Sequence, residues 1–164
     1  MRDIAIYAGT FDPITLGHID IIKRALKIFD RLVIALPNVS EKSTFFDLIS
    51  RIQMIRKSAI EFEKNISVET FDGYLVDFAK SKNIKFLIRG MRDEVDFHYE
   101  YEMANANQHL NSDIDTICFF ASMSDANISS TKVKQMAKDG QDLSAVVPEC
   151  VKKFFDRKDV LCER

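Results

Sequence analysis

The sequence predicts an α/β fold built on a parallel sheet, and three observations lead to that prediction. Segments typical of strands alternate with segments typical of helices along the 164 residues. The strand segments are near-continuous apolar runs, as expected where helices cover both faces of a parallel sheet. The first strand stops at a glycine and the chain continues into an amphipathic helix, an arrangement that α/β folds use to bind phosphate.

The first half of the chain predicts three strands and two helices. Strands are expected at about 3–8, 31–36 and 66–71, and a helix is expected at about 17–29. The inner face of this helix should consist of Ile22, Ala25, Leu26 and Phe29. A second helix should begin near Asp47, which is a suitable N-cap. Its buried face is expected to consist of Leu48, Ile52, Ile55, Ala59 and Ile60.

The second half continues the alternation. Gly73 should precede a short helix at 75–82, and a strand at 85–88 should end at Arg89 and Gly90. The next expected elements are a long helix at 94–110, a strand at 116–121, a helix from Ser129 to Gly140, and a last helix opened by Pro148. Val151, Phe154 and Phe155 should dock that last helix. The expected fold class is α/β: a single domain, 1–164, with a Rossmann-like, doubly wound sheet of five parallel strands and helices on both faces.

Composition excludes several classes of protein. Apolar residues make up 46% and charged residues 29%, which is ordinary for a soluble globular protein. The formal net charge of −2 provides no basic field for nucleic acid. Cys118, Cys150 and Cys162 form no C-x-x-C pair, so a disulfide framework or zinc site is not expected, and Cys118 should be a small buried hydrophobe. Without a signal peptide or an apolar run of about 20 residues, we expect a cytoplasmic protein without membrane contact.

The turn after the first strand carries the strongest functional signal. Residues 9–13 are Gly-Thr-Phe-Asp-Pro, and residues 15–18 are Thr-Leu-Gly-His. His18 therefore lies at the head of a helix, where unpaired N–H groups favour anions. Its ring N–H could bond a phosphate oxygen as charge builds in a transition state. Thr10 could reach a phosphate or cap the turn, whereas Asp12 is expected to bond the backbone of its own loop.

Loops that follow parallel strands meet at one edge of the sheet, so further candidates should gather near His18. Lys42, after the second strand, could clamp a reacting phosphate. Arg89 and Arg92 flank Gly90 and Met91 and could bind a polyphosphate, or pair with Asp93, Glu94 or Asp96. Glu100 could bond a ribose or orient the arginines. His98 and His109 are given no functional role.

The fifth loop ends in a second possible anion site. Residues 128–131 are Ile-Ser-Ser-Thr at the head of a helix, where hydroxyls and free N–H groups could bind phosphate or simply cap the helix. Phosphates held at the two helix heads, one at His18 and one at Ser129, would bracket one triphosphate.

These motifs resemble those of the T/H-x-G-H nucleotidyltransferases, and more closely the bacterial phosphopantetheine adenylyltransferase family. The resemblance rests on residues 8–15 with 17–20, on 87–92, on Asp96-Phe97 with Tyr99-Glu100, and on 128–130. It implies transfer of adenylyl from ATP to 4′-phosphopantetheine, which gives dephospho-CoA and pyrophosphate in coenzyme A biosynthesis. It also implies a homohexamer, Mg²⁺ on the nucleotide, and inhibition by CoA.

The resemblance also assigns residues. Phosphopantetheine would contact Thr10, Lys42, Leu75 and Arg89. ATP would contact Thr10, Phe11, His18, Arg89, Gly90, Met91, Arg92, Glu100, Asp125, Ala126, Asn127, Ile128, Ser129, Ser130 and Thr131. The catalytic set would be His18, Lys42 and Arg92, with no metal ligand from the protein. The chain departs from the family at 125–127, Asp-Ala-Asn, where a bulky residue and a serine are usual.

The expected mechanism is in-line attack of the acceptor phosphate on the α-phosphorus, without a covalent enzyme intermediate. One alternative is a nicotinamide mononucleotide adenylyltransferase, which residues 128–131 with Lys134 resemble. Thr15, Lys134 and the block from Arg89 to Glu100 depart from that pattern. A cytidylyltransferase and a non-catalytic nucleotide sensor are further alternatives, separated by the use of CTP and by ATP binding without pyrophosphate release.

Overall fold

The computed structural model describes residues 4–39, 43–122 and 127–162, with side chains described as far as residue 156. The strands are β1 (Ile4–Ala8), β2 (Arg31–Pro37), β3 (Ile66–Phe71), β4 (Phe86–Met91) and β5 (Asp115–Phe120). The helices are α1 (Leu16–Ala25), α2 (Leu48–Ser58), η1 (Ile60–Phe62, a 3₁₀ turn), α3 (Leu75–Ser81), α4 (Glu94–Leu110), α5 (Ser130–Lys138) and α6 (Glu149–Cys162). Within the described ranges, no helix is both long and apolar enough to cross a membrane.

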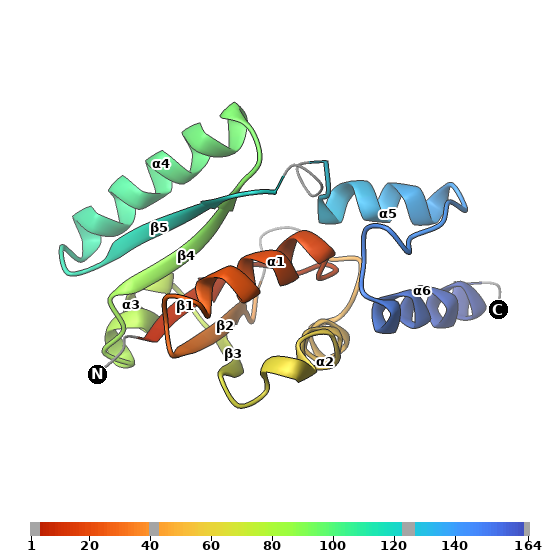
Figure 1. Ribbon diagram of the computed structural model, residues 1–164, viewed down its shortest axis with the longest axis horizontal. Coiled ribbons are helices and arrows are strands. Elements are labelled where there is room, and N and C mark those ends of the chain that lie inside the picture. The colour runs from red at the N-terminus through yellow and green to blue at the C-terminus, as the bar shows by residue number, and fades with distance from the viewer. Residues whose placement is uncertain (1–3, 40–42, 123–126, 163–164) are drawn as a thin grey trace.

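The five strands form one sheet in the order β3-β2-β1-β4-β5, and every neighbouring pair is parallel. β1 is central, with β2 and β3 on one side and β4 and β5 on the other (Figure 1). The strand order therefore reverses between β1 and β4. In open α/β sheets a ligand binds beyond the carboxyl ends of the strands at such a reversal. The predicted α/β fold with a doubly wound sheet of five parallel strands is confirmed.

Successive side chains of a strand point to opposite faces of the sheet, and this divides the core into two layers. Tyr7 of β1 and Ile88 of β4 pack in the larger cluster, which also contains apolar residues of α1, α2, α5 and α6. Ile6 and Ala8 point to the opposite face and pack with Val76 of α3 in a second cluster. α4 lies along β4 and β5 (Figure 1), and Arg89, next to Ile88, pairs with its Glu100. Helices therefore cover both faces of the sheet.

Side-chain caps fix where the helices begin. Thr15 caps α1, Asp47 caps α2, Asp93 caps α4 and Ser129 caps α5, each accepting a hydrogen bond from the backbone N–H three residues on. Each cap satisfies one of the N–H groups that a helix start leaves without a partner. The predicted cap at Asp47 is confirmed, and Ser129 caps α5, which was the alternative to an anion site at that segment.

Two predictions about the first two helices are wrong in detail. α1 ends at Ala25, not near residue 29, because the chain turns at 26–28, yet Phe29 stays buried. Ile60 was expected in the core of α2, but that helix ends at Ser58, and Ile60 opens the 3₁₀ turn with 62% of its surface exposed. Arg51 and Met54 are buried residues of α2 that the expected pattern lacked.

β4 is longer than predicted, and this changes the site. Arg89, Gly90 and Met91 belong to the strand and pair with residues 118–120 of β5 rather than forming a loop. Gly90 has a steric role there, since a Cβ atom at this position would clash with Cδ1 of Ile21. Cys118, expected to be buried, is only partly so, because β5 is an edge strand.

Candidate active site

A cavity of about 300 Å³ lies where the strand order reverses. It is bounded by the ends of β1, β4 and β5 and by the N-terminal residues of α1 and α5. The described residues that carry its polar chemistry are Thr15, His18, Arg89, Arg92, Asp96, Glu100, Ser129, Ser130 and Thr131. The loops after β1, β4 and β5 therefore meet around this cavity, as predicted. The loop after β3 does not line it, and Lys42, in the loop after β2, lies outside the described residues.

His18 is held in one orientation by its own helix. It is the third residue of α1 and forms a reciprocal capping box with Thr15. The Thr15 backbone N–H donates to His18 Nδ1 over 3.0 Å, and Thr15 Oγ1 lies 2.9 Å from the same nitrogen. Because Nδ1 accepts that backbone hydrogen bond, the neutral ring carries its proton on Nε2. The ring of Phe11 packs edge-on against it, with centroids 5.1 Å apart.

The neutral form of His18 is strongly favoured. Burial, which is the largest cause, and the nearby charges of Arg92 and Arg89 together lower the pKa of His18 to about 4. At neutral pH the residue is therefore an imidazole that can donate one hydrogen bond from Nε2. It is not a cation, so its chemistry toward a phosphate is that of a hydrogen-bond donor.

We expect the NMR signals of the His18 ring to titrate with a midpoint near pH 4 in the folded protein. The unfolded chain, with the ordinary pKa of 6.5, takes up the proton first on acidification. Stability that the neutral ring provides above pH 6.5 is therefore lost as the pH falls toward 4. The free energy of unfolding should fall by about 3 kcal/mol more than in a His18→Gln variant between pH 7 and pH 4.

Glutamine suits this comparison because it can keep the capping box at the same helix position. Equal acid sensitivity of the two proteins would contradict the low pKa of His18.

The two arginines of the cavity are both paired with carboxylates of α4. Arg89 binds Glu100 through two hydrogen bonds, of 2.6 and 2.7 Å, and donates a third, of 2.9 Å, to the carbonyl of Ala8. Arg92 binds Asp96 through two hydrogen bonds, of 2.8 and 3.0 Å. The expectation that Glu100 could orient an arginine fits the first pair, and the alternative of a local ion pair fits the second.

These pairs differ in how freely the arginine can reach a ligand. Glu100 is 7% exposed and holds Arg89 close to the end of β1. The side chain of Arg92 is 36% exposed, so it can exchange Asp96 for a phosphate at small cost. Arg92 is therefore the cation of the described cavity that a polyphosphate can recruit most easily.

The N-terminus of α5 forms another wall of the cavity. Ser129 caps the helix, and Ile128, Ser130 and Thr131 line the cavity beside it. Ser130 Oγ donates a hydrogen bond of 2.8 Å to the carbonyl of Pro13, which joins this helix to the loop after β1. Two helix N-termini thus face one cavity, as the sequence predicted. Their partial positive charges favour an anion between them.

The structure brings together most of the predicted site residues. Those that line the cavity are Phe11, His18, Arg89, Gly90, Met91, Arg92, Glu100, Ile128, Ser129, Ser130 and Thr131. Thr10, Leu75 and Asn127 do not line it. Lys42, Asp125 and Ala126 lie outside the described residues.

The structure also shows where Thr10 and Leu75 lie instead of in the cavity wall. The Thr10 carbonyl accepts a hydrogen bond from Arg51, and Leu75 opens α3 and packs against the second core cluster. Sequence reasoning missed Tyr7 and Ile21 of the cavity wall. The hydrophobic periodicity of β1 and of α1 could have indicated Tyr7 and Ile21, because each of these two residues lies on the same face of its element as residues assigned to the core.

Comparison with known proteins identifies the family to which this chain belongs. The family model described as Cytidylyltransferase-like matches residues 6–136. A phosphopantetheine adenylyltransferase from Campylobacter curvus is 46% identical over 148 residues, which covers 90% of this chain and 94% of the relative. The chain belongs to the phosphopantetheine adenylyltransferase family. Being a member, it is a nucleotidyltransferase enzyme.

Two further matches extend this result. The phosphopantetheine adenylyltransferase from Nautilia profundicola is 45% identical over 144 residues, covering 88% of this chain and 93% of the relative. A solved structure from Vibrio parahaemolyticus, described as a candidate nicotinate-nucleotide adenylyltransferase, superimposes with a TM-score of 0.67 at 16% identity. It covers 93% of this chain and 91% of that chain. At that identity the match shows a shared fold, which is the fold predicted here.

Proposed function

We propose that this member of the phosphopantetheine adenylyltransferase family transfers the adenylyl group of ATP to 4′-phosphopantetheine. The products are dephospho-CoA and pyrophosphate, a step of coenzyme A biosynthesis. The observation that carries the proposal is the meeting of His18, Arg92 and the N-terminus of α5 around one cavity. The names of relatives 45% and 46% identical to this chain supply the substrates.

The reaction needs little covalent chemistry from the protein. A phosphate oxygen of phosphopantetheine forms a bond to the α-phosphorus of ATP. The bond from that phosphorus to the oxygen that bridges the α- and β-phosphates breaks, and this oxygen leaves with the pyrophosphate. A phosphate monoester is already ionised at neutral pH, so no general base is required. The protein contributes positioning and stabilisation of the negative charge.

Each group around the cavity has a role in this proposal. The Nε2–H of His18 donates to a non-bridging oxygen of the reacting phosphoryl group, where charge builds in the transition state. The N–H groups at the start of α5 bind the leaving pyrophosphate. Arg92 leaves Asp96 and adds a mobile positive charge, whereas Arg89 stays fixed by Glu100. Lys42, Thr10 and Leu75 remain proposed contacts of phosphopantetheine on the basis of the family resemblance.

Magnesium enters this proposal with ATP. Among the described residues no group of three His, Cys, Asp or Glu side chains could hold a metal ion, and both carboxylates of the cavity bind arginines. Phosphate oxygens of the nucleotide would therefore supply the ligands, as Mg²⁺ at nucleotide sites prefers. The homohexamer, the inhibition by CoA and the cytoplasmic location stay predictions of the resemblance and of the sequence.

The decisive test is release of pyrophosphate that requires both ATP and 4′-phosphopantetheine. We expect no release when either is omitted, and little when CTP replaces ATP. Release with nicotinamide mononucleotide as the acceptor, but not with phosphopantetheine, would favour the alternative adenylyltransferase. Binding of ATP without any pyrophosphate release would instead identify a nucleotide sensor.

A further inference from the structure

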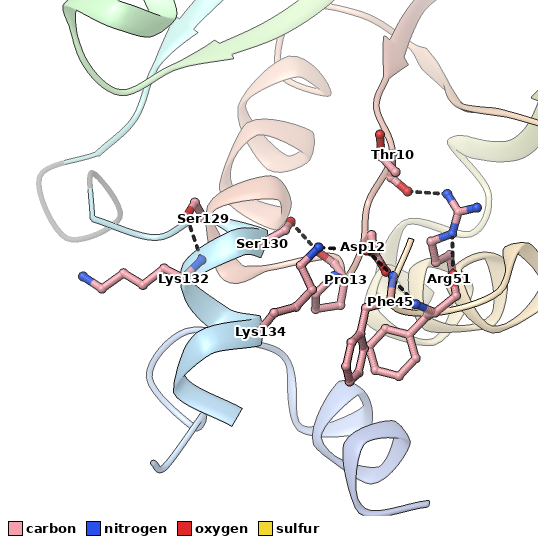
Figure 2. Close-up of polar contacts among 10 residues, drawn as sticks. Thr10, Asp12, Pro13, Phe45, Arg51, Ser129, Ser130, Lys132 and Lys134 are labelled. Carbon is pink, nitrogen blue, oxygen red and sulfur yellow. Dashed lines mark hydrogen bonds and ion pairs between the residues drawn. The ribbon is translucent and has the colours of Figure 1, made fainter. Parts of the chain in front are cut away.

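Asp12 is a buried carboxylate that does not line the cavity. It is 4% exposed and accepts backbone N–H bonds from Phe45 and Phe46, of 2.7 and 2.8 Å. Lys134 of α5 donates a third bond, of 3.0 Å, to the same carboxylate (Figure 2). The expected bonding of Asp12 within its own loop is thus replaced by bonds to two segments far away in the sequence.

Arg51 of α2 completes this cluster from the other side. It is 3% exposed and donates to the carbonyl of Phe46 at 3.2 Å and to the carbonyl of Thr10 at 2.8 Å. Residue 46 is therefore held at its N–H by Asp12 and at its C=O by Arg51. Buried charges persist in a fold where hydrogen bonds satisfy them, as both are here.

Two hydrogen bonds join α5 to neighbouring residues of the loop after β1. Lys134 binds the side chain of Asp12, and Ser130 binds the carbonyl of Pro13 (Figure 2). Ser130 and Lys134 are four residues apart and so lie on one face of the helix. This face fixes the helix against the loop, while Ser129 and Thr131 remain beside the cavity.

The same loop determines the position of His18. Phe11, next to Asp12, has a φ of 47°, a left-handed conformation that is uncommon for an aromatic residue and must be held by its surroundings. Its ring contacts the rings of both Tyr7 and His18. The backbone that Asp12 holds therefore places the ring that packs against His18.

On the basis of the proposed function, we propose that the ion pair between Asp12 and Lys134 positions α5 against the loop after β1. It thereby sets the spacing between the N-terminus of α5 and His18 across the cavity. Both are positioning residues, because neither lines the cavity. Since the leaving group and the reacting phosphoryl group would be bound by two different helices, a small change in this spacing should slow the reaction.

The test compares Lys134→Met with Lys134→Arg and Lys132→Met. Methionine keeps most of the apolar stem and removes the charge, whereas arginine restores an ion pair with Asp12. Lys132 is a matched control on the same helix, and its side chain points away from Asp12 (Figure 2). We expect Lys134→Met to lower kcat at least about 10-fold per folded molecule, with KM for ATP within about threefold of wild type. Lys134→Arg should recover most of this loss, and Lys132→Met should behave as wild type.

A second measurement separates this proposal from the proposed function. The NMR signals of the His18 ring should shift in Lys134→Met, because the neighbouring Phe11 ring moves, and stay in place in Lys132→Met. Wild-type kcat in Lys134→Met, whatever its melting temperature, would overturn the positioning role, and so would unmoved His18 signals. A wild-type protein that releases no pyrophosphate would contradict the proposed function, while the ring signals would still decide the positioning role.

Discussion

Replacing His18 by alanine should lower the turnover number about 10²-fold or more and change KM for ATP much less. The reason is that Nε2–H is oriented before the reaction by the bond from the Thr15 backbone to Nδ1. A donor held in this way stabilises the charge of the transition state more than that of bound ATP. The loss of one such donor corresponds to roughly 3 kcal/mol of barrier. Steady-state rates of pyrophosphate release give both constants.

Alanine also removes one side of the capping box, so a second variant is needed. His18→Glu keeps an acceptor for the Thr15 N–H, because glutamate is suited to this helix position, but it has no donor at neutral pH. We expect it to be as inactive as alanine while thermal unfolding shows that α1 is retained. Normal turnover in the alanine variant would rule out the role assigned to His18.

Replacing Glu100 by alanine should destabilise the fold by about 3 kcal/mol, because it breaks a largely buried pair and leaves the Arg89 charge without its partner. The two side chains are 9% and 26% exposed, and Glu100 is the one buried residue among those described in α4. For a chain of this length the melting temperature should fall by roughly 10 °C. Chemical denaturation and thermal scans measure both quantities.

Asp96→Ala provides a matched control on the same helix. It removes a pair of the same geometry, but Arg92 and Asp96 are 36% and 22% exposed, so the expected cost is about 1 kcal/mol or less. Equal destabilisation by the two variants would show that burial does not distinguish the pairs. Loss of Asp96 should also leave Arg92 freer to bind phosphate, whereas loss of Glu100 should release Arg89 from the end of β1.

The sheet was predictable because its signal is local. The apolar runs at 31–36 and 66–71 lie within the observed β2 and β3, and Asp47 and Ser129 cap the helices expected after them. The errors fall where a tertiary neighbour decides. β4 continues through Gly90 because β5 supplies the partner strand, and Ile60 is exposed because α2 ends before it. The local pattern contains neither the pairing of β4 with β5 nor the early end of α2.

The site was predictable for a different reason. Parallel strands end at one edge of the sheet, so the loops after β1, β4 and β5 had to meet there, and His18, Arg92 and Ser129 line the same cavity. The partner of each charge was only partly predictable, because the sequence offered several carboxylates for the two arginines. Arg89 lines the cavity and also binds Glu100 of α4, and Thr10 presents its carbonyl to Arg51 outside the cavity.

The sequence by itself determined which residues gather at the carboxyl edge of the sheet, because hydrophobic periodicity and glycine-marked turns are properties of short segments. Only the tertiary structure decided how those residues are held. Glu100 accepts hydrogen bonds from Arg89, Asp12 accepts them from Phe46 and Lys134, and burial keeps the imidazole of His18 neutral. The physical reason is that ion pairing and burial depend on distances between segments that lie far apart in the chain.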